Sequence, residues 1–447
     1  MFNRLFLILC FFGVGSAVTA NNTVDAVTSF EISNGMKVVV IEDDRAPVVQ
    51  HMVWYPVGAA DEPSGVSGVA HFLEHLMFKA TDNLESGELS SIVAANGGTS
   101  NAFTSWDYTA YFQRVASDRL ELMMEMESDR MRNLRLTEND IVTERQVVIE
   151  ERNQRIENSP GALFNEQINA AQYLNHQYGK PIIGWRHEIE NLQMEDVYKF
   201  YNEHYAPNNA FLIVSGDVLP EEVRQLAEKY YGIIPANALA GVRPRSQEPP
   251  PRAERRLTYE DARVGQPYIS RSYIAPKRET GDQRMAAALT FLAEVLGGGK
   301  TSLLVEELQF NQKIAVYAGA FYRGMSRDDT TFDVVVVPTA SVSLQEAEDA
   351  MDEVIHSFFE SGIGVEKLER IKTQIRASEI YARDNAEAVA RRYGVALSSG
   401  LSVEDVQLWP DKLQAVTEEE ILNAARLVLQ PERSVTGWLL KSEGVEE

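Results

Sequence analysis

Two patterns of apolar residues recur along the chain, and they predict different elements. Short apolar runs rich in β-branched residues, such as Met36 to Ile41 and Val48 to Tyr55, predict buried strands. Apolar residues at helical spacing between Leu192 and Tyr205 predict an amphipathic helix. Pro207 stops that helix, and the apolar run Phe211 to Ser215 predicts another strand. The first half of the chain is therefore expected to mix strands and helices.

The second half of the chain begins as the first half does. Gly265-Gln266-Pro267 leads into a predicted strand at Tyr268 to Ile274. In the first half, Arg45-Ala46-Pro47 leads in the same way into the predicted strand at Val48 to Tyr55. A proline just before an apolar run marks the start of a strand, because proline fits poorly inside one.

The ends of the two halves match as well. Thr417 and the three acids after it favour a helix start, Pro431 follows that helix, and Ser434 to Leu440 predicts a strand. The steps from Leu192 to Pro207 and from Val416 to Pro431 both span 15 positions. We therefore expect an α+β fold with two duplicated domains, each a mainly antiparallel sheet covered by helices.

A proline-rich segment separates the two halves. Residues 243–256 contain Pro249-Pro250-Pro251, and consecutive prolines are extended and join neither a helix nor a central strand. We expect one domain at residues 24–242, a linker at residues 243–256 and a second domain at residues 257–447.

The first 20 residues have the features of a secretory signal peptide. Arg4 gives a short positive region, Leu5 to Val18 is almost entirely apolar, and Val18-Thr19-Ala20 offers small residues for cleavage. An uncleaved membrane anchor is the alternative. Cys10 is the single cysteine, so the cleaved protein would have no thiol for a disulfide. We expect an exported protein, in the periplasm of a Gram-negative bacterium, with no stable membrane insertion after cleavage.

The composition is that of a soluble globular protein with a strong acidic excess. Acidic residues number 66 against 42 lysines and arginines, which gives a formal net charge of -24. This excludes nucleic acid as an expected partner, because such proteins carry a basic surface. Two interpretations of the charge stay open, a solvated acidic surface and a preference for basic peptides.

The clearest chemical motif lies in a stretch with helical character, Val69 to Lys79. His71 and His75 are four residues apart, about one helical turn, so both imidazoles point from one face toward a common metal position. Glu74 borders the same face, where it is placed to act as a base on water. This is the reverse order of the more familiar zinc-peptidase motif. The alternative is two histidines on a partly buried helix with a salt-bridged glutamate.

A second predicted helix offers a third metal ligand. It starts near Thr137, and an apolar stripe that includes Ile141 and Val148 gives it a buried face. Glu144 and Glu151 are seven positions apart, two turns, so they share another face. Paired acids on one face suit a ligand and a group that orients it. A charged, solvated helix face is the alternative.

The motif and two further stretches resemble the pitrilysin (insulinase) metallopeptidases. Their inverted zinc motif is similar to the run His71-Phe72-Leu73-Glu74-His75-Leu76-Met77-Phe78-Lys79. Gly97 to Thr104 and Tyr201 to Val218 also match, and the resemblance covers nearly all of the mature chain. It is strongest to the shorter members, which are similar to the catalytic subunit of the mitochondrial processing peptidase.

The resemblance implies roles for particular residues. In the family a glutamate about 76 residues after the second histidine is the third ligand of one zinc ion, which here is Glu151, with Glu144 seven residues before it. Gly97 to Thr104 corresponds to an edge strand on which the substrate pairs, with Asn101 and Ala102 near the scissile bond. The fold implied is half of a clam-shell chamber, closed by a second chain.

One part of the family pattern is missing. The complete active site also needs an arginine and a tyrosine seven residues apart in a second-half domain. Tyr317 is present, but Phe310 stands seven residues before it, and the second-half helix Met285 to Val295 has no histidine. We therefore expect an inactive second domain and a homologous sister subunit that supplies the arginine in a heterodimer. The alternatives are a homodimer, or a small insertion that brings Lys313 into the role.

The function expected from these residues is a zinc-dependent endopeptidase. Glu74 would act as the base, His71, His75 and Glu151 would hold the zinc, and Glu144 would support the catalytic centre. Asn101, Ala102 and Tyr317 would bind a peptide or an unfolded segment as an extended strand. The main alternative is a non-catalytic structural or binding subunit of the same fold.

Overall fold

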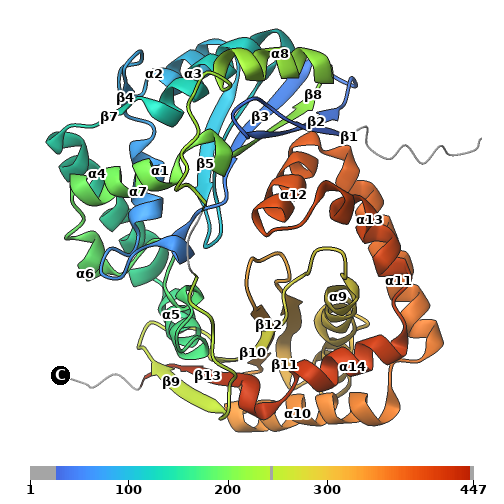
Figure 1. Ribbon diagram of the computed structural model, residues 1–447. Helices are drawn as coiled ribbons and strands as arrows, with labels where there is room; N and C mark the ends of the chain where they lie inside the picture. The colour runs from blue at the N-terminus through green and yellow to red at the C-terminus, as the bar shows by residue number, and fades with distance from the viewer. Residues whose placement is uncertain (1–26, 242–244, 443–447) are drawn as a thin grey trace, which may run out of the picture.

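The computed structural model describes residues 27–241 and 245–442 (Figure 1). The expected signal peptide, residues 1–20, and residues 243–244 of the expected linker lie outside this description. Within it the chain forms two large sheets, one in each half, with helices packed on both. The small pair β4 (Ala80–Thr81) and β7 (Leu134–Arg135) forms a third sheet. None of the helices in the described residues combines the length and the apolarity needed to cross a membrane.

The first sheet has six strands in the order β1-β2-β8-β3-β6-β5. All neighbours are antiparallel except β2 and β8, which are parallel. Strand β5 is an edge strand, because within residues 27–241 and 245–442 only β6 pairs with it. The strands are β1 (Val27–Glu31), β2 (Lys37–Glu42), β3 (Val48–Tyr55), β5 (Thr99–Thr104), β6 (Thr109–Ala116) and β8 (Phe211–Gly216).

The second sheet repeats this plan with five strands in the order β11-β12-β10-β13-β9. Its one parallel pair, β13 and β9, occupies the position of β8 and β2 in the first sheet. This common strand order confirms the predicted duplication and the α+β fold. The strands are β9 (Arg255–Glu260), β10 (Tyr268–Ala275), β11 (Ala315–Tyr322), β12 (Thr330–Pro338) and β13 (Ser434–Leu440). The last two residues of the expected linker therefore belong to β9.

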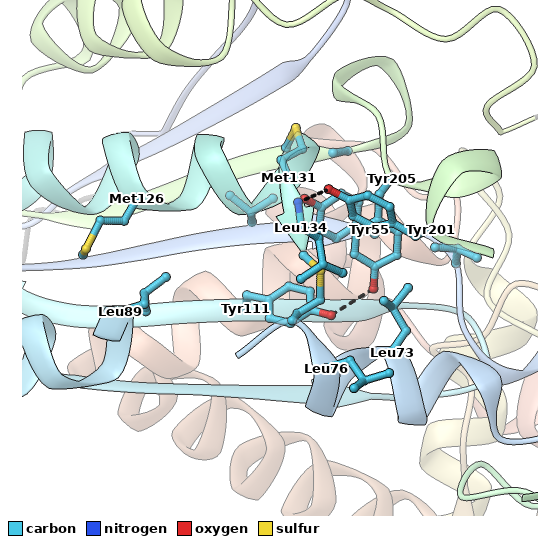
Figure 2. Close-up of a cluster of buried hydrophobic side chains, with 14 of the residues drawn as sticks. Tyr55, Leu73, Leu76, Leu89, Tyr111, Met126, Met131, Leu134, Tyr201 and Tyr205 are labelled. Atoms are coloured by element: carbon cyan, nitrogen blue, oxygen red, sulfur yellow. Dashed lines mark hydrogen bonds between the residues drawn. The ribbon is translucent and has the colours of Figure 1, made fainter. Parts of the chain in front are cut away.

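Helices of the first half bury one face of the first sheet. Figure 2 shows Leu73 and Leu76 of α1 directed into a cluster of buried tyrosines, where the hydroxyls of Tyr111 and Tyr205 are hydrogen-bonded at 2.9 Å. This packing fixes the apolar face of α1 and so determines where its polar residues point. The helices are α1 (Val69–Leu76), α2 (Glu88–Ala95), α3 (Leu120–Arg132), α4 (Glu138–Arg152), α5 (Pro160–Gln172), α6 (Arg186–Ile189), α7 (Met194–His204) and α8 (Pro220–Tyr230).

The two halves exchange helices, which the hydrophobic pattern did not predict. Helix α12 of the second half covers the other face of the first sheet, where Gly394 lies against the ring of Trp54. Helix α5 of the first half lies against β13 of the second sheet (Figure 1). Its Phe164 belongs to a buried cluster with Val435 and Leu439 of that strand. Each half therefore completes the core of the other. The second-half helices are α9 (Arg284–Gly297), α10 (Leu344–Ser361), α11 (Val365–Tyr381), α12 (Ala386–Ser398), α13 (Val403–Gln414) and α14 (Glu418–Val428).

Candidate zinc site

Three predicted ligand residues meet where α1 crosses α4. The Nε2 atom of His71 lies 3.6 Å from Oε2 of Glu151, and Nε2 of His75 lies 3.2 Å from the same oxygen. All three ligand atoms lie within 4.8 Å of one another. Within the described residues this is the one group of three or more histidine, cysteine or acidic side chains that is placed to hold a metal ion.

The donor set and its spacing fit zinc. Tetrahedral bonds of about 2.0–2.1 Å place neighbouring ligand atoms about 3.3 Å apart, close to the spacing around Glu151 Oε2. That oxygen is buried and faces Nε2 of both histidines. Because a buried carboxylate is costly unless its charge is compensated, a cation between this oxygen and the two imidazoles would balance that charge. Two histidine nitrogens and one carboxylate oxygen are the ligand types of a catalytic zinc site with an open fourth position.

Glu144 holds the outer nitrogen of one histidine. Its Oε1 lies 2.9 Å from Nδ1 of His75, and its Oε2 forms an ion pair with Nζ of Lys79 at 2.6 Å. The sequence suggested that Glu144 would orient the glutamate ligand, but the structure places it on His75 instead. A carboxylate on the outer nitrogen fixes the ring orientation and leaves Nε2 free to face the metal position.

The substitution Glu144→Gln tests this contact. We expect zinc affinity to fall by about 10- to 100-fold, because the amide is a weaker hydrogen-bond partner for His75 and leaves Lys79 without its ion pair. Competition with a zinc-binding dye measures the affinity. An exposed acid on the same helix, Glu138, gives the control variant Glu138→Gln, which should bind zinc as the wild type does. Wild-type affinity in Glu144→Gln would contradict the assigned role.

The electrostatics around the histidines favour positive charge at the ligand position. Burial, with the neighbouring His75, lowers the pKa of His71 to about 4, so this imidazole is neutral near pH 7. Burial also opposes the charge on His75, but hydrogen bonds with Glu144 and Glu151 raise its pKa to about 9. The hydrogen bond with His75 holds the pKa of Glu144 at about 2. Two ionised carboxylates thus converge on His75.

Glu74, on the same helix as the two histidines, lines the same cleft as the ligand residues. Its Oε2 accepts a hydrogen bond from the hydroxyl of Thr104 at 2.5 Å, and Thr104 is the last residue of edge strand β5. Burial raises the pKa of the Glu74 carboxyl, although the Thr104 hydroxyl opposes this. The contact joins the predicted base to the strand on which a substrate is expected to lie.

Three residues of the site were missed from the sequence, namely Lys79, Thr104 and Arg155. Arg155 forms an ion pair with Oε1 of Glu151 at 2.7 Å and so holds the oxygen that faces away from the histidines. The spacing of four residues between Glu151 and Arg155 was the one available signal. Thr104 lies 30 positions from Glu74 in the sequence, and Lys79 lies 65 positions from Glu144, so no local pattern pairs them.

The candidate ligands lie in a cleft of about 1290 Å³. One wall is strand β5 with Asn101 and Ala102, and the side-chain oxygen of Asn101 accepts a hydrogen bond from the N–H of Ala102 at 2.9 Å. The opposite wall is α4 and the π-helical turn that follows it, Asn153–Glu157. Tyr317 lies on β11 of the second sheet and does not line this cleft.

Comparison with known proteins places both halves in one family. Residues 37–185 match the family described as Insulinase (Peptidase family M16), and residues 191–375 match the Peptidase M16 inactive domain. The zinc protease PqqE of Helicobacter pylori is 32% identical over 381 residues, which are 84% of each chain. The chain belongs to the insulinase (M16) peptidase family. This confirms the resemblance found in the sequence, and the relatives of this M16 chain are named zinc proteases.

Solved structures show the same M16 fold. The crystal structure of a protease from Helicobacter pylori superposes with a TM-score of 0.87 at 28% identity, covering 93% of this chain and 100% of that one. The periplasmic protease PqqL from Escherichia coli superposes with a TM-score of 0.80 at 18% identity. That match covers 93% of this M16 chain but only 48% of the PqqL chain. At this identity the PqqL match shows the fold alone.

Proposed function

We propose that this M16 chain is a zinc-dependent endopeptidase that cleaves peptides or unfolded segments. The observation that carries the proposal is the convergence of His71, His75 and Glu151 beside Glu74 in an open cleft. A binding or structural subunit has no use for a half-buried carboxylate next to the ligand position, so Glu74 favours the enzyme over that alternative.

Different residues of the chain would have different roles in the reaction. When bound, zinc would supply a Lewis acid that polarises the scissile carbonyl and lowers the pKa of water toward neutrality. Glu74 would take the proton of the attacking water at its carboxylate and pass it to the leaving amine. Thr104 would hold Glu74 in place through its hydroxyl. Glu144 and Arg155 would keep His75 and Glu151 in their orientations.

Strand β5 would bind the substrate by strand addition. Its outer edge is unpaired, and Asn101 to Thr104 line the same cleft as the candidate ligands. A peptide that pairs with this edge is held extended by backbone hydrogen bonds, so recognition depends on conformation as well as on sequence.

An experiment with modified peptides tests the proposed activity. The mature chain with zinc should cleave an unstructured peptide at a few sites, identified by mass spectrometry. N-methylation of the backbone beside a cleaved bond should reduce cleavage there by about 10-fold or more, because each methyl group removes one backbone donor of about 1–1.5 kcal/mol and clashes with β5. Methylation far from the site is the control. No cleavage of any peptide, with or without a homologous partner chain, would contradict the proposal.

The assembly and location are further parts of the proposal. A homologous sister subunit would close a clam-shell chamber and supply the arginine that Phe310 replaces, and a homodimer is the alternative. The long PqqL chain, of which this fold covers 48%, supports a second unit of similar size. We also propose export by the signal peptide at residues 1–20 and a periplasmic location. The proposed units are a catalytic domain at 24–242, a linker at 243–256, whose last two residues belong to β9, and an inactive repeat that begins with β9 and includes residues 257–447.

A further inference from the structure

The helix that carries the two histidines begins without a cap of its own. Its first flanking residue, Gly68, has a positive φ of 89° and no side chain to accept the free N–H groups. Glu62 supplies the acceptors instead, with Oε2 2.9 Å from the N–H nitrogen of Gly68 and Oε1 2.9 Å from that of Ala70. Ala70 immediately precedes His71. The buried carboxylate of Glu62 therefore fixes the turn from which the first histidine projects.

Asp61, the residue before Glu62, connects this turn to the linker between the two halves. Asp61 accepts a hydrogen bond from the N–H of Gly58 at 3.0 Å and lies 3.3 Å from the guanidinium of Arg245. Arg245 belongs to the proline-rich linker, yet its side chain is only 11% exposed. Through Arg245, the linker is therefore held against the segment that ends in Glu62.

Arg245 joins two more carboxylates from separate parts of the chain. It forms an ion pair with Asp107, just after edge strand β5, and lies 2.7 Å from Asp328 in the second half. Asp107 also accepts a hydrogen bond from the backbone N–H of Arg327 at 3.0 Å. Because one guanidinium faces three carboxylates, its removal leaves several poorly solvated negative charges side by side. The cluster therefore holds the second half, the end of β5 and the Asp61-Glu62 segment together.

We propose that Arg245 and Glu62 are positioning residues of the zinc site, which connect the placement of the second half to the helix that carries His71 and His75. Arg245 fastens Asp61 to the second half through Asp328, and Glu62 transmits that position to the start of α1. Neither residue touches the ligand position. The inference rests on the proposed zinc function and adds a role for the linker and for the second half, which has no zinc motif.

Zinc affinity in a double-mutant cycle tests the inference. Zinc alone is titrated, in competition with a dye, into the wild type, Glu62→Gln, Arg245→Gln and the double variant. Each single change should weaken zinc binding by about 10-fold, as loss of a supporting group does. The double variant should bind zinc with about the same affinity as the single variant that binds it less tightly. The two effects should not add, because both changes interrupt the same connection. Asp328→Asn weakens the contact of Arg245 with the second half, together with the contact between Asp328 and His176. It should give a loss of a few-fold in zinc affinity, and it replaces Arg245→Gln if that variant does not fold.

A matched control separates positioning from general destabilisation. Glu348 is buried in the second half, where it pairs with Arg256 and Arg271, but has no contact with the Arg245 cluster. Glu348→Gln should lower the unfolding temperature and leave zinc affinity unchanged. The inference would be overturned if both Glu62→Gln and Asp328→Asn bound zinc with wild-type affinity, or if the losses of the two single variants added fully in the double variant. Either result would leave the proposed function standing. A wild type that binds no zinc would overturn the proposed function as well.

Discussion

Glu74→Gln is expected to bind zinc as tightly as the wild type and to lose about 100- to 10,000-fold in the rate of peptide cleavage. The size follows from the usual contribution of a positioned general base. Glutamine has nearly the same shape and still accepts the hydrogen bond from Thr104, so the local structure should persist. The amide has no basic oxygen that takes a proton from water. The rate constant kcat and the zinc content, measured on the same preparation, test this expectation.

Thr104→Val gives the comparison for Glu74→Gln. This variant keeps the carboxylate but removes the hydroxyl that holds it, so a smaller loss, about 10-fold, is expected. If Glu74→Gln cleaved peptides at more than a tenth of the wild-type rate, Glu74 would not be the base. If it lost zinc as well as activity, Glu74 would belong among the ligands, and the assignment of Glu151 would need revision.

Glu151→Gln is expected to lower zinc affinity by more than about 100-fold and to abolish cleavage with it. Loss of a ligand should exceed the 10- to 100-fold effect of losing a supporting group. Glu151 brings the one carboxylate oxygen that lies close to Nε2 of both histidines. Without its charge, the two imidazoles alone would hold the metal weakly. Zinc content by mass spectrometry of the native protein, with cleavage measured in parallel, gives the result.

The neighbouring residue provides a matched control for Glu151→Gln. Glu150 lies beside Glu151 on α4, but its carboxylate accepts hydrogen bonds from Asn153 and Gln154 rather than from the histidines. Glu150→Gln makes the same change in charge one position away, and it should keep both zinc and activity. Equal losses in the two variants would point to a general effect of negative charge in the cleft, and would contradict a specific ligand at position 151.

The elements near the site were largely predictable from local pattern. Strand β3 begins and ends at the predicted residues, Val48 and Tyr55, because a proline precedes the run and most of its residues are apolar. Helix α4 starts directly after Thr137, near the predicted position, and the Thr137 side chain accepts a hydrogen bond from the N–H of Asp140. His71 and His75 share a face of α1 because the helical period alone determines that geometry.

The contacts between distant segments were not predictable in this way. Local pattern gave no indication that α12 of the second half packs on the first sheet. The partners of Glu144 and Glu74, namely Lys79 and Thr104, depend on how α1, α4 and β5 pack together. The cap on α1 comes from Glu62, too far before the helix to fit a capping box. Tyr317 was assigned by resemblance, and the fold places it on β11, away from the cleft.

Anomalous X-ray diffraction at the zinc absorption edge, from crystals of the zinc-loaded chain, tests the central claim most directly. The expected result is one strong peak bonded to Nε2 of His71, Nε2 of His75 and a carboxylate oxygen of Glu151, at distances of about 2.0–2.2 Å. A peak at any other position, or full zinc loading of the His71→Ala variant, would contradict the account.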